Sequence, residues 1–148
     1  MTIKTFLRKF ESKAEIEDIA GIVLDVASYK NFVPHVSTSR IISQNGNEII
    51  AELVISFLNF KVPYTSKITF DISEKEAIIN VTEHGSNTFK KLYNKWKILK
   101  ADKEIIIDFE VEFELSNKML NFLASASLGL VADTILEAFI KRTQKILN

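Results

Sequence analysis

Residues Met119–Ala132 read MLNFLASASLGLVA, a run of fourteen residues without a formal charge that begins a long predicted helix continuing through Thr134–Thr143. A helix that only covers a core needs one apolar stripe. The residues that could form this stripe are Leu120, Leu123, Leu128 and Val131. Met119, Phe122 and Leu130 lie outside it. Fourteen residues are too few for a bilayer span, which needs about 20. We therefore expect the apolar surface outside the stripe to meet an internal cavity, a membrane surface or a partner.

The composition is that of an ordinary globular protein, with 47% hydrophobic and 26% charged residues. A length of 148 residues predicts a single domain, 1–148. Nineteen basic residues balance nineteen acidic ones, so we expect no DNA partner from the overall charge. The lack of cysteine excludes disulfides and thiolate chemistry. The N-terminus lacks the apolar segment of a secretory signal, which predicts a cytoplasmic protein.

The N-terminal part of the chain is predicted to contain a strand and two helices. Ile3 and the charged Lys4 begin a strand-like alternation. Apolar residues at helical spacing predict a helix over Ala14–Asp25. A short helical turn around Ser28–Phe32 should end near Pro34, because the residue before a proline is pushed out of the α region.

From Pro34 onward the apolar residues recur with a period of two, which is typical of strands. The odd positions of Ile49–Leu58 form one apolar face, and the even positions of Lys61–Ile72 form another. The link Asn59-Phe60 between them is interpreted as a hairpin turn.

The last predicted hairpin has the clearest alternation. Apolar residues alternate with lysines before a turn at Ala101-Asp102-Lys103 and with acidic residues after it. This turn predicts that Lys95 lies opposite Asp108. By the same register Lys91 faces Glu112, and each such pair contributes about 0.2–1 kcal/mol. The ladder of lysines and acids is interpreted as a solvated sheet face.

The predicted order is one strand, two short helices, six strands in a meander and a long C-terminal helix. Short connections make the strands antiparallel. The chain is therefore predicted to have an α+β fold, in which a curved seven-stranded antiparallel sheet wraps around the C-terminal helix. The space between sheet and helix is the natural ligand site.

No set of residues typical of catalysis is present. His35 and His84 are not at metal-ligand spacing, and no G-x-S-x-G or phosphate-binding glycine loop occurs. Tyr64 and Ser66 are inward polar residues that could orient a polar head group or be satisfied within the core. We therefore expect a protein that is not an enzyme.

Aromatic residues are concentrated on the predicted inner surface of the sheet and the facing side of the helix. Those expected to point inward are Phe57, Tyr64, Phe70, Trp96, Phe109, Phe113, Phe122 and Phe139. They are the residues that a curved-sheet core would use, and together they could also line a planar apolar ligand site.

Several short motifs match a known family in order and spacing. Tyr29-Lys-Asn-Phe32-Val33-Pro34, followed by Ser39-Arg40-Ile, resembles the Y-x-x-F-[LV]-P…S-R-[VI] signature of the START-like polyketide-cyclase superfamily. More narrowly it resembles the coenzyme-Q-binding branch, which also contains the bacterial ribosome-association toxins. Further matches are Tyr64-Thr-Ser-Lys67, Phe89–Trp96, Phe109–Glu114 and Ala138–Arg142. The chain departs from the family pattern at His35-Val36 and at Gly85–Phe89.

This resemblance implies a helix-grip fold whose hydrophobic tunnel binds a polyprenyl quinone. It implies that the protein holds or delivers ubiquinone (coenzyme Q) for respiratory electron transport without any required cofactor. The helix containing Met119–Ala132 would form the movable wall of the tunnel and contact the inner face of the respiratory membrane transiently. From pattern and resemblance together, the expected ligand-binding residues are Val33, Pro34, Phe57, Tyr64, Ser66, Leu92, Trp96, Phe109, Phe113, Phe122, Leu123 and Leu130.

Two other functions stay open. The chain could be a ribosome-association toxin of a toxin–antitoxin pair, which binds the large ribosomal subunit and blocks subunit joining. Lys90, Lys91, Lys95 and Lys97 would give such a protein one basic patch. A cyclase or hydrolase-like enzyme of the wider superfamily is disfavoured by the missing ionisable pocket residues.

Overall fold

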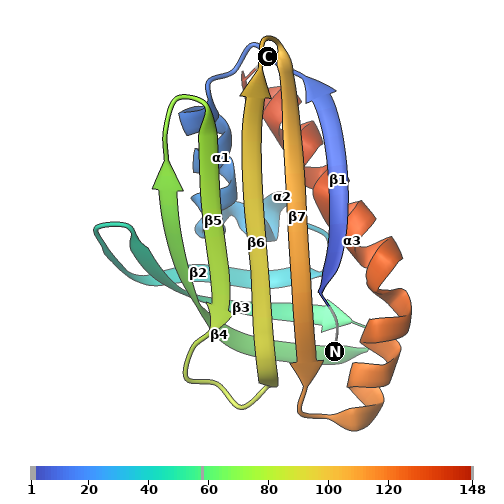
Figure 1. Cartoon of the computed structure of the whole chain (residues 1–148). Helices are drawn as coiled ribbons and strands as arrows, with labels where there is room; N and C mark the ends of the chain where they lie inside the picture. The colour runs from blue at the N-terminus through green and yellow to red at the C-terminus, as the bar shows by residue number, and fades with distance from the viewer. Residues whose placement is uncertain (1–2, 58, 148) are drawn as a thin grey trace.

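The structure is a computed structural model that describes residues 3–57 and 59–147 (Figure 1). Its elements in chain order are β1 (Lys4–Glu11), α1 (Ile16–Leu24), the 3-10 turn η1 (Val26–Ser28), α2 (Tyr29–Phe32), β2 (Val36–Asn45), β3 (Glu48–Phe57), β4 (Phe60–Ile72), β5 (Glu76–Glu83), β6 (Phe89–Ala101), β7 (Glu104–Leu115) and α3 (Lys118–Leu147). The predicted order of one strand, short helices, six strands and a long helix is confirmed.

The strands form one seven-stranded sheet in the order β1-β7-β6-β5-β4-β3-β2, and every pairing is antiparallel. The strands from β2 to β7 form a meander, and β1 adds to the free edge of β7. This confirms the predicted α+β fold with a seven-stranded antiparallel sheet and a long C-terminal helix.

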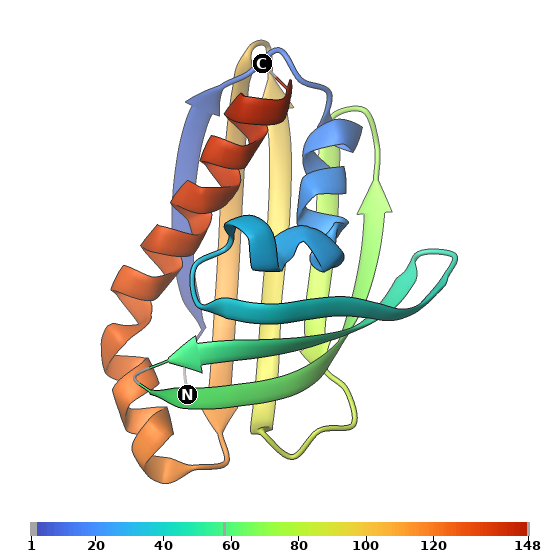
Figure 2. The same cartoon turned by 180° about the vertical axis from the view of Figure 1, so that it is seen from behind.

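The sheet bends strongly, so that β2 and β3 run across the direction of β6 and β7 (Figures 1 and 2). Register shifts interrupt β2 between Val36 and Thr38 and between Ile41 and Ser43. Such irregularities bend and twist a strand locally. The three helices lie on the concave side of the sheet, which is the arrangement implied by a helix grip (Figure 2).

The helices between β1 and β2 agree with the prediction. α1 buries Ile16, Ile19 and Val23 at helical spacing, within the range predicted to be helical. α2 ends where Val33 adopts an extended conformation, with φ −88° and ψ 122°. Val33 precedes a proline, so the steric restriction expected there operates in the structure.

The β3–β4 turn is shorter than the sequence suggested. Phe60, predicted to lie in the turn, is the first residue of β4 and pairs with Phe57. Asn59 has φ 69°, a conformation that suits a tight hairpin turn and that asparagine tolerates. Leu58, the predicted end of the preceding strand, lies outside the described residues.

The register of the last hairpin differs from the prediction by two residues. Lys95 pairs with Glu110 instead of Asp108. The reason is the turn: Ala101 already pairs with Glu104, which leaves a two-residue turn in which Asp102 has φ 60°. A shift of two residues keeps every side chain on its face, so the alternation of apolar and charged residues is unaffected.

The lysine–acid ladder persists in the corrected register. Lys91 is directly opposite Glu114 and forms its ion pair diagonally with Glu112. Glu114 is in turn 3.7 Å from the Nζ atom of Lys90, which lies at the register shift of β6. These pairs lie on the convex face, because the apolar side chains of the same strands point to the concave core.

The C-terminal half of α3 is anchored by aromatic packing. The ring of Phe139, 3% exposed, lies 5.3 Å from Tyr29, 5.2 Å from Phe32 and 4.9 Å from Trp96, edge-on in each case. Leu136 is fully buried beside it. Phe139 therefore joins α3 to α2 and to the centre of β6.

We expect Phe139→Ala to lower the free energy of unfolding by about 3–5 kcal/mol, because it removes a buried ring from this junction. Phe122→Ala, on the same helix at a 71% exposed position, should change it by less than about 0.5 kcal/mol. Urea denaturation of both variants tests the difference. Equal losses would contradict the assignment of Phe139 as the anchor.

Candidate functional site

An apolar cavity of about 210 Å³ lies between the bent sheet and the N-terminal half of α3. The residues that line it are Ile55, Phe57, Val62, Tyr64, Phe89, Leu92, Asn94, Phe109, Val111, Phe113, Leu115, Leu120, Ala124, Leu128, Val131, Ala132 and Ile135. All but Tyr64 and Asn94 are hydrocarbon side chains, so the cavity suits an apolar ligand.

Three parts of the fold supply the walls. β6 and β7 form the floor with the inward residues of their alternating pattern, while β3 and β4 form a side wall. α3 forms the opposite wall and packs against β1, β7, α1 and α2. Six helix residues line the cavity, and all but the neighbours Val131 and Ala132 follow one another at intervals of three or four: Leu120, Ala124, Leu128, Val131, Ala132 and Ile135.

The polar lining groups of the cavity are neutral. Burial raises the pKa of Tyr64 to about 12, so its hydroxyl keeps its proton at physiological pH. Its ring stacks edge-on against Phe89 at 5.3 Å. The Oδ1 atom of Asn94 is buried without a hydrogen-bond partner among residues 3–57 and 59–147. With no Asp, Glu, Lys, Arg or His in the described lining, the cavity favours an uncharged ligand.

The structure brings five of the predicted ligand-binding residues together in this cavity: Phe57, Tyr64, Leu92, Phe109 and Phe113. Trp96 lies behind them. Its ring is 4.8 Å from that of Phe109 and 4.9 Å from that of Phe139. It therefore lies in the core between the lining residue Phe109 and the anchor of α3.

Three predicted residues from the strands and the α2–β2 turn lie elsewhere. Val33 and Ser66 are buried in the core and are not part of the cavity lining. Pro34 lines a separate groove between α2 and α3. Their matches to the family motif therefore reflect positions in the fold and not contacts with this cavity.

The structure does not place Phe122, Leu123 and Leu130, which the sequence predicts to face the ligand, in the cavity lining. Phe122 and Leu130 are 71% and 74% exposed on the other side of α3. Leu123 is half-buried and does not line the cavity. With 3.6 residues per turn, the stripe through Leu120 and Ala124 faces inward, which turns Phe122 and Leu130 outward.

Met119, Phe122 and Leu130 thus form an outer apolar face, with Met119 59% exposed. By length and composition alone, α3 is long and apolar enough to cross a membrane, a property that core helices of soluble proteins share. The fourteen residues Met119–Ala132 alone are too few for a bilayer span. That criterion is too strict for α3, because the apolar part of the helix extends beyond Ala132.

The predicted ligand-binding set omits four floor residues, Phe89, Asn94, Val111 and Leu115, of which alternation alone identifies the last three. Asn94 lies between the inward residues Leu92 and Trp96, and Val111 lies between Phe109 and Phe113. Neither is aromatic, although Val111 is one of the matched positions of its motif. Asn94 matters more, because it is one of only two polar side chains in the described lining.

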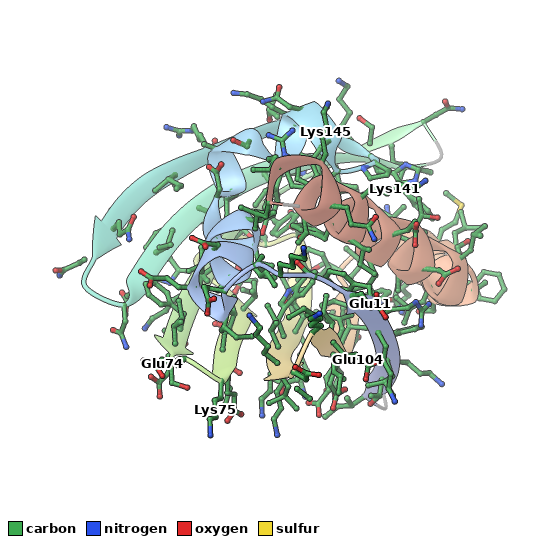
Figure 3. The ribbon with its side chains drawn as sticks, turned by 90° about the horizontal axis from the view of Figure 1, so that it is seen from above. Glu11, Glu74, Lys75, Glu104, Lys141 and Lys145 are labelled. Atoms are coloured by element: carbon green, nitrogen blue, oxygen red, sulfur yellow. The ribbon has the colours of Figure 1, made fainter. Side chains whose placement is uncertain are left out.

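A second hollow, the polar groove, has a volume of about 660 Å³ and lies between α2 and the C-terminal half of α3. Its lining includes Lys141, Arg142 and Lys145 together with acidic residues of α3. Figure 3 shows Lys141 and Lys145 on the side of α3 turned away from β1 and β7. The guanidinium carbon of Arg142 lies 4.9 Å from the centre of the Phe32 ring.

The histidines are outside both hollows. His35 has φ 71° in the turn before β2, and its ring is 6.4 Å from that of Phe57. His84 follows β5, and its backbone N–H donates to the Thr65 carbonyl. Within the described part of the chain, no group of three or more His, Asp or Glu residues could hold a metal ion.

Residues 13–140 match the sequence profile of the family described as polyketide cyclase / dehydrase and lipid transport. The chain belongs to this family. The mitochondrial coenzyme Q-binding protein COQ10 of Drosophila melanogaster is 27% identical over 134 residues, which are 88% of this chain and 54% of that protein. The chain therefore spans about half the length of this relative.

A second relative has a different name and a similar sequence identity to this chain. The ribosome association toxin RatA of Rickettsia prowazekii is 26% identical over 127 residues, 86% of this chain and 87% of that protein. Among solved structures, the Zhui aromatase/cyclase from Streptomyces sp. R1128 superposes with a TM-score of 0.77 at 10% identity, over 99% of this chain and 97% of that chain. This likeness confirms the START-like fold.

We expect Ala124→Leu to fill part of the cavity and to weaken binding of the neutral one-ring ligand fluorobenzene about tenfold or more, which is about 1.4 kcal/mol. Ala126→Leu adds the same atoms at an exposed position of α3 and should leave binding unchanged. Titration followed by ¹⁹F NMR measures both. Equal binding by the two variants would show that the ring does not enter the cavity.

Proposed function

We propose that the protein binds ubiquinone or a similar polyprenyl quinone without chemically changing it, and delivers it for respiratory electron transport. The observation that carries this proposal is the apolar cavity with uncharged polar groups, which matches a neutral ring. The name of the COQ10 relative supports the same ligand class. The described lining contains no ionisable group except Tyr64, which favours binding over catalysis.

The volume of the cavity limits what part of the ligand enters. An apolar cavity of about 150 Å³ is known to hold benzene, so a cavity of about 210 Å³ accommodates one substituted ring. A polyprenyl tail of many isoprene units does not fit beside it. We therefore place the ring inside the protein and the tail outside.

The affinity expected for the ring also favours an arrangement with the ring inside the protein and the tail outside. A ring that buries ~150 Å² of apolar surface gains roughly 4 kcal/mol at about 25 cal/mol per Å². This corresponds to a dissociation constant of about 1 mM. Ring binding alone is therefore weak, and the protein needs a high local concentration of quinone, which a membrane provides.

The outer apolar face of α3 supplies the membrane contact in this proposal. Met119, Phe122 and Leu130 are exposed on the helix that also forms the cavity wall. Embedded at the headgroup boundary, they would hold the cavity close to quinones in the bilayer. We place the protein peripherally at the inner face of the respiratory membrane.

Trp96 gives a direct test, because it is the single tryptophan of the chain and its ring packs on the lining residue Phe109. Vesicles of phosphatidylcholine that contain ubiquinone should quench its fluorescence, whereas the same vesicles without quinone should not. Ala124→Leu should reduce the quenching about tenfold at equal vesicle concentration, as for about 1.4 kcal/mol of lost affinity. Identical fluorescence with and without quinone in the wild-type protein would rule the function out.

Association with the large ribosomal subunit is the second candidate function. It is supported by the RatA relatives, whose identity to this chain is similar to that of COQ10. It is also supported by the basic residues Lys141, Arg142 and Lys145 in the polar groove, since contacts to ribosomal RNA are made largely by such residues.

If the polar groove binds the ribosome, Lys141→Glu combined with Lys145→Glu should abolish co-sedimentation with purified large subunits, and added salt should weaken the wild-type interaction steeply. Ala124→Leu should leave co-sedimentation unchanged, because it alters only the cavity. The absence of wild-type co-sedimentation at low salt would eliminate this candidate.

A further inference from the structure

Asn94 has a hydrogen-bond acceptor that the protein itself leaves unused. Its Oδ1 atom is buried and has no partner among the described residues. In the sheet, Asn94 pairs with Val81 of β5 and Val111 of β7, so the neighbouring side chains at the same level are apolar. A buried acceptor without a donor destabilises a folded protein, and such an exception calls for an explanation.

Asn94 is part of the cavity lining, where a bound ligand can supply the missing donor. On β6 it lies between Leu92, also in the lining, and the buried Trp96. Its amide group carries one acceptor oxygen and two donor hydrogens. A ligand hydroxyl group can donate to the oxygen and accept from the nitrogen. A ligand carbonyl group can only accept, and it leaves Oδ1 unpaired.

The two redox forms of a quinone differ in this respect. The oxidised ring carries only acceptor oxygens, whereas the hydroquinone, formed by adding two electrons and two protons, carries two hydroxyl groups. The other polar lining residue, Tyr64, has a hydroxyl that both donates and accepts and therefore fits either form. Asn94 is therefore the polar lining residue that can distinguish the two forms.

We propose that Asn94 makes the cavity selective for the reduced ring, the hydroquinone, over the oxidised quinone. This inference rests on the proposed function and adds a redox preference to it. Satisfying one buried acceptor corresponds to about tenfold in affinity. By linkage, a tenfold preference raises the reduction potential of the bound quinone by about 30 mV. The protein would therefore favour the reduced state of the ring that it holds.

The test compares the tail-free ring 2,3-dimethoxy-5-methyl-1,4-benzoquinone with its hydroquinone under anaerobic conditions. NMR titration of the ¹⁵N-labelled protein suits millimolar affinities and follows the Asn94 side-chain amide and the Trp96 indole directly. The wild-type protein should bind the hydroquinone about tenfold more tightly, which is about 1.4 kcal/mol. Asn94→Leu should bind both forms equally, because the hydroquinone loses the bonds to both amide atoms, whereas the quinone loses at most the bond from the amide nitrogen.

Thermal unfolding separates a binding role from a structural one. Because Asn94→Leu removes an unpaired buried polar group without a large change of shape, its melting temperature should rise while hydroquinone affinity falls. Ser66→Ala is the matched control: Ser66 is buried on the inward side of β4 outside the cavity lining, and its loss should leave the ratio of affinities unchanged.

The outcomes distinguish the two proposals. If the wild-type protein binds neither ring form, the quinone-binding function and the redox preference are both overturned. If it binds the two forms with equal affinity, only the role of Asn94 is overturned. That role is also overturned if Asn94→Leu keeps the wild-type preference or loses affinity for both forms equally.

Discussion

The packing of Phe139 against Tyr29, Phe32 and Trp96 is the interaction on which the rest of the structure depends. It fixes the C-terminal half of α3 to the middle of a strongly bent sheet. A helix fixed at one end does not follow that bend along its whole length. The N-terminal half of α3 therefore stands off from β3 and β4, and the space left between them is the cavity.

Side-chain size keeps this space open. Two of the helix residues that line the cavity are alanines, Ala124 and Ala132. Leucines at those positions would fill the space and extend the core. An apolar void of this kind lowers stability, because its lining atoms lose van der Waals partners. Asn94 adds an unpaired polar atom to the same place. Two local departures from good core packing at one site are typical of a binding function.

Alternation in the strands makes most of the fold predictable, because only the odd or only the even positions of a strand can face the buried side. Turn length is not encoded in that parity, which is why the predicted partner of Lys95 is Asp108 and the observed one is Glu110. The direction of α3 is harder still to predict. Both of its faces are apolar, and the larger residues Phe122 and Leu130 suggest the wrong inner face. Which side of such a helix is buried is decided by the anchor at Phe139, a contact distant in sequence.

In the proposed function, the two apolar faces of α3 let one helix contact both the ligand cavity and a membrane. The inner stripe through Leu128 contacts the space that fits a ring, and the outer apolar face is exposed at the same level of the helix. A ligand with a small polar ring and a long apolar tail could therefore remain partly in the bilayer while its ring is bound. The solved aromatase/cyclase with the same fold shows that the architecture does not dictate chemistry. Here the neutral lining, with Asn94 and Tyr64 as its polar groups, favours recognition of an intact ring over its conversion.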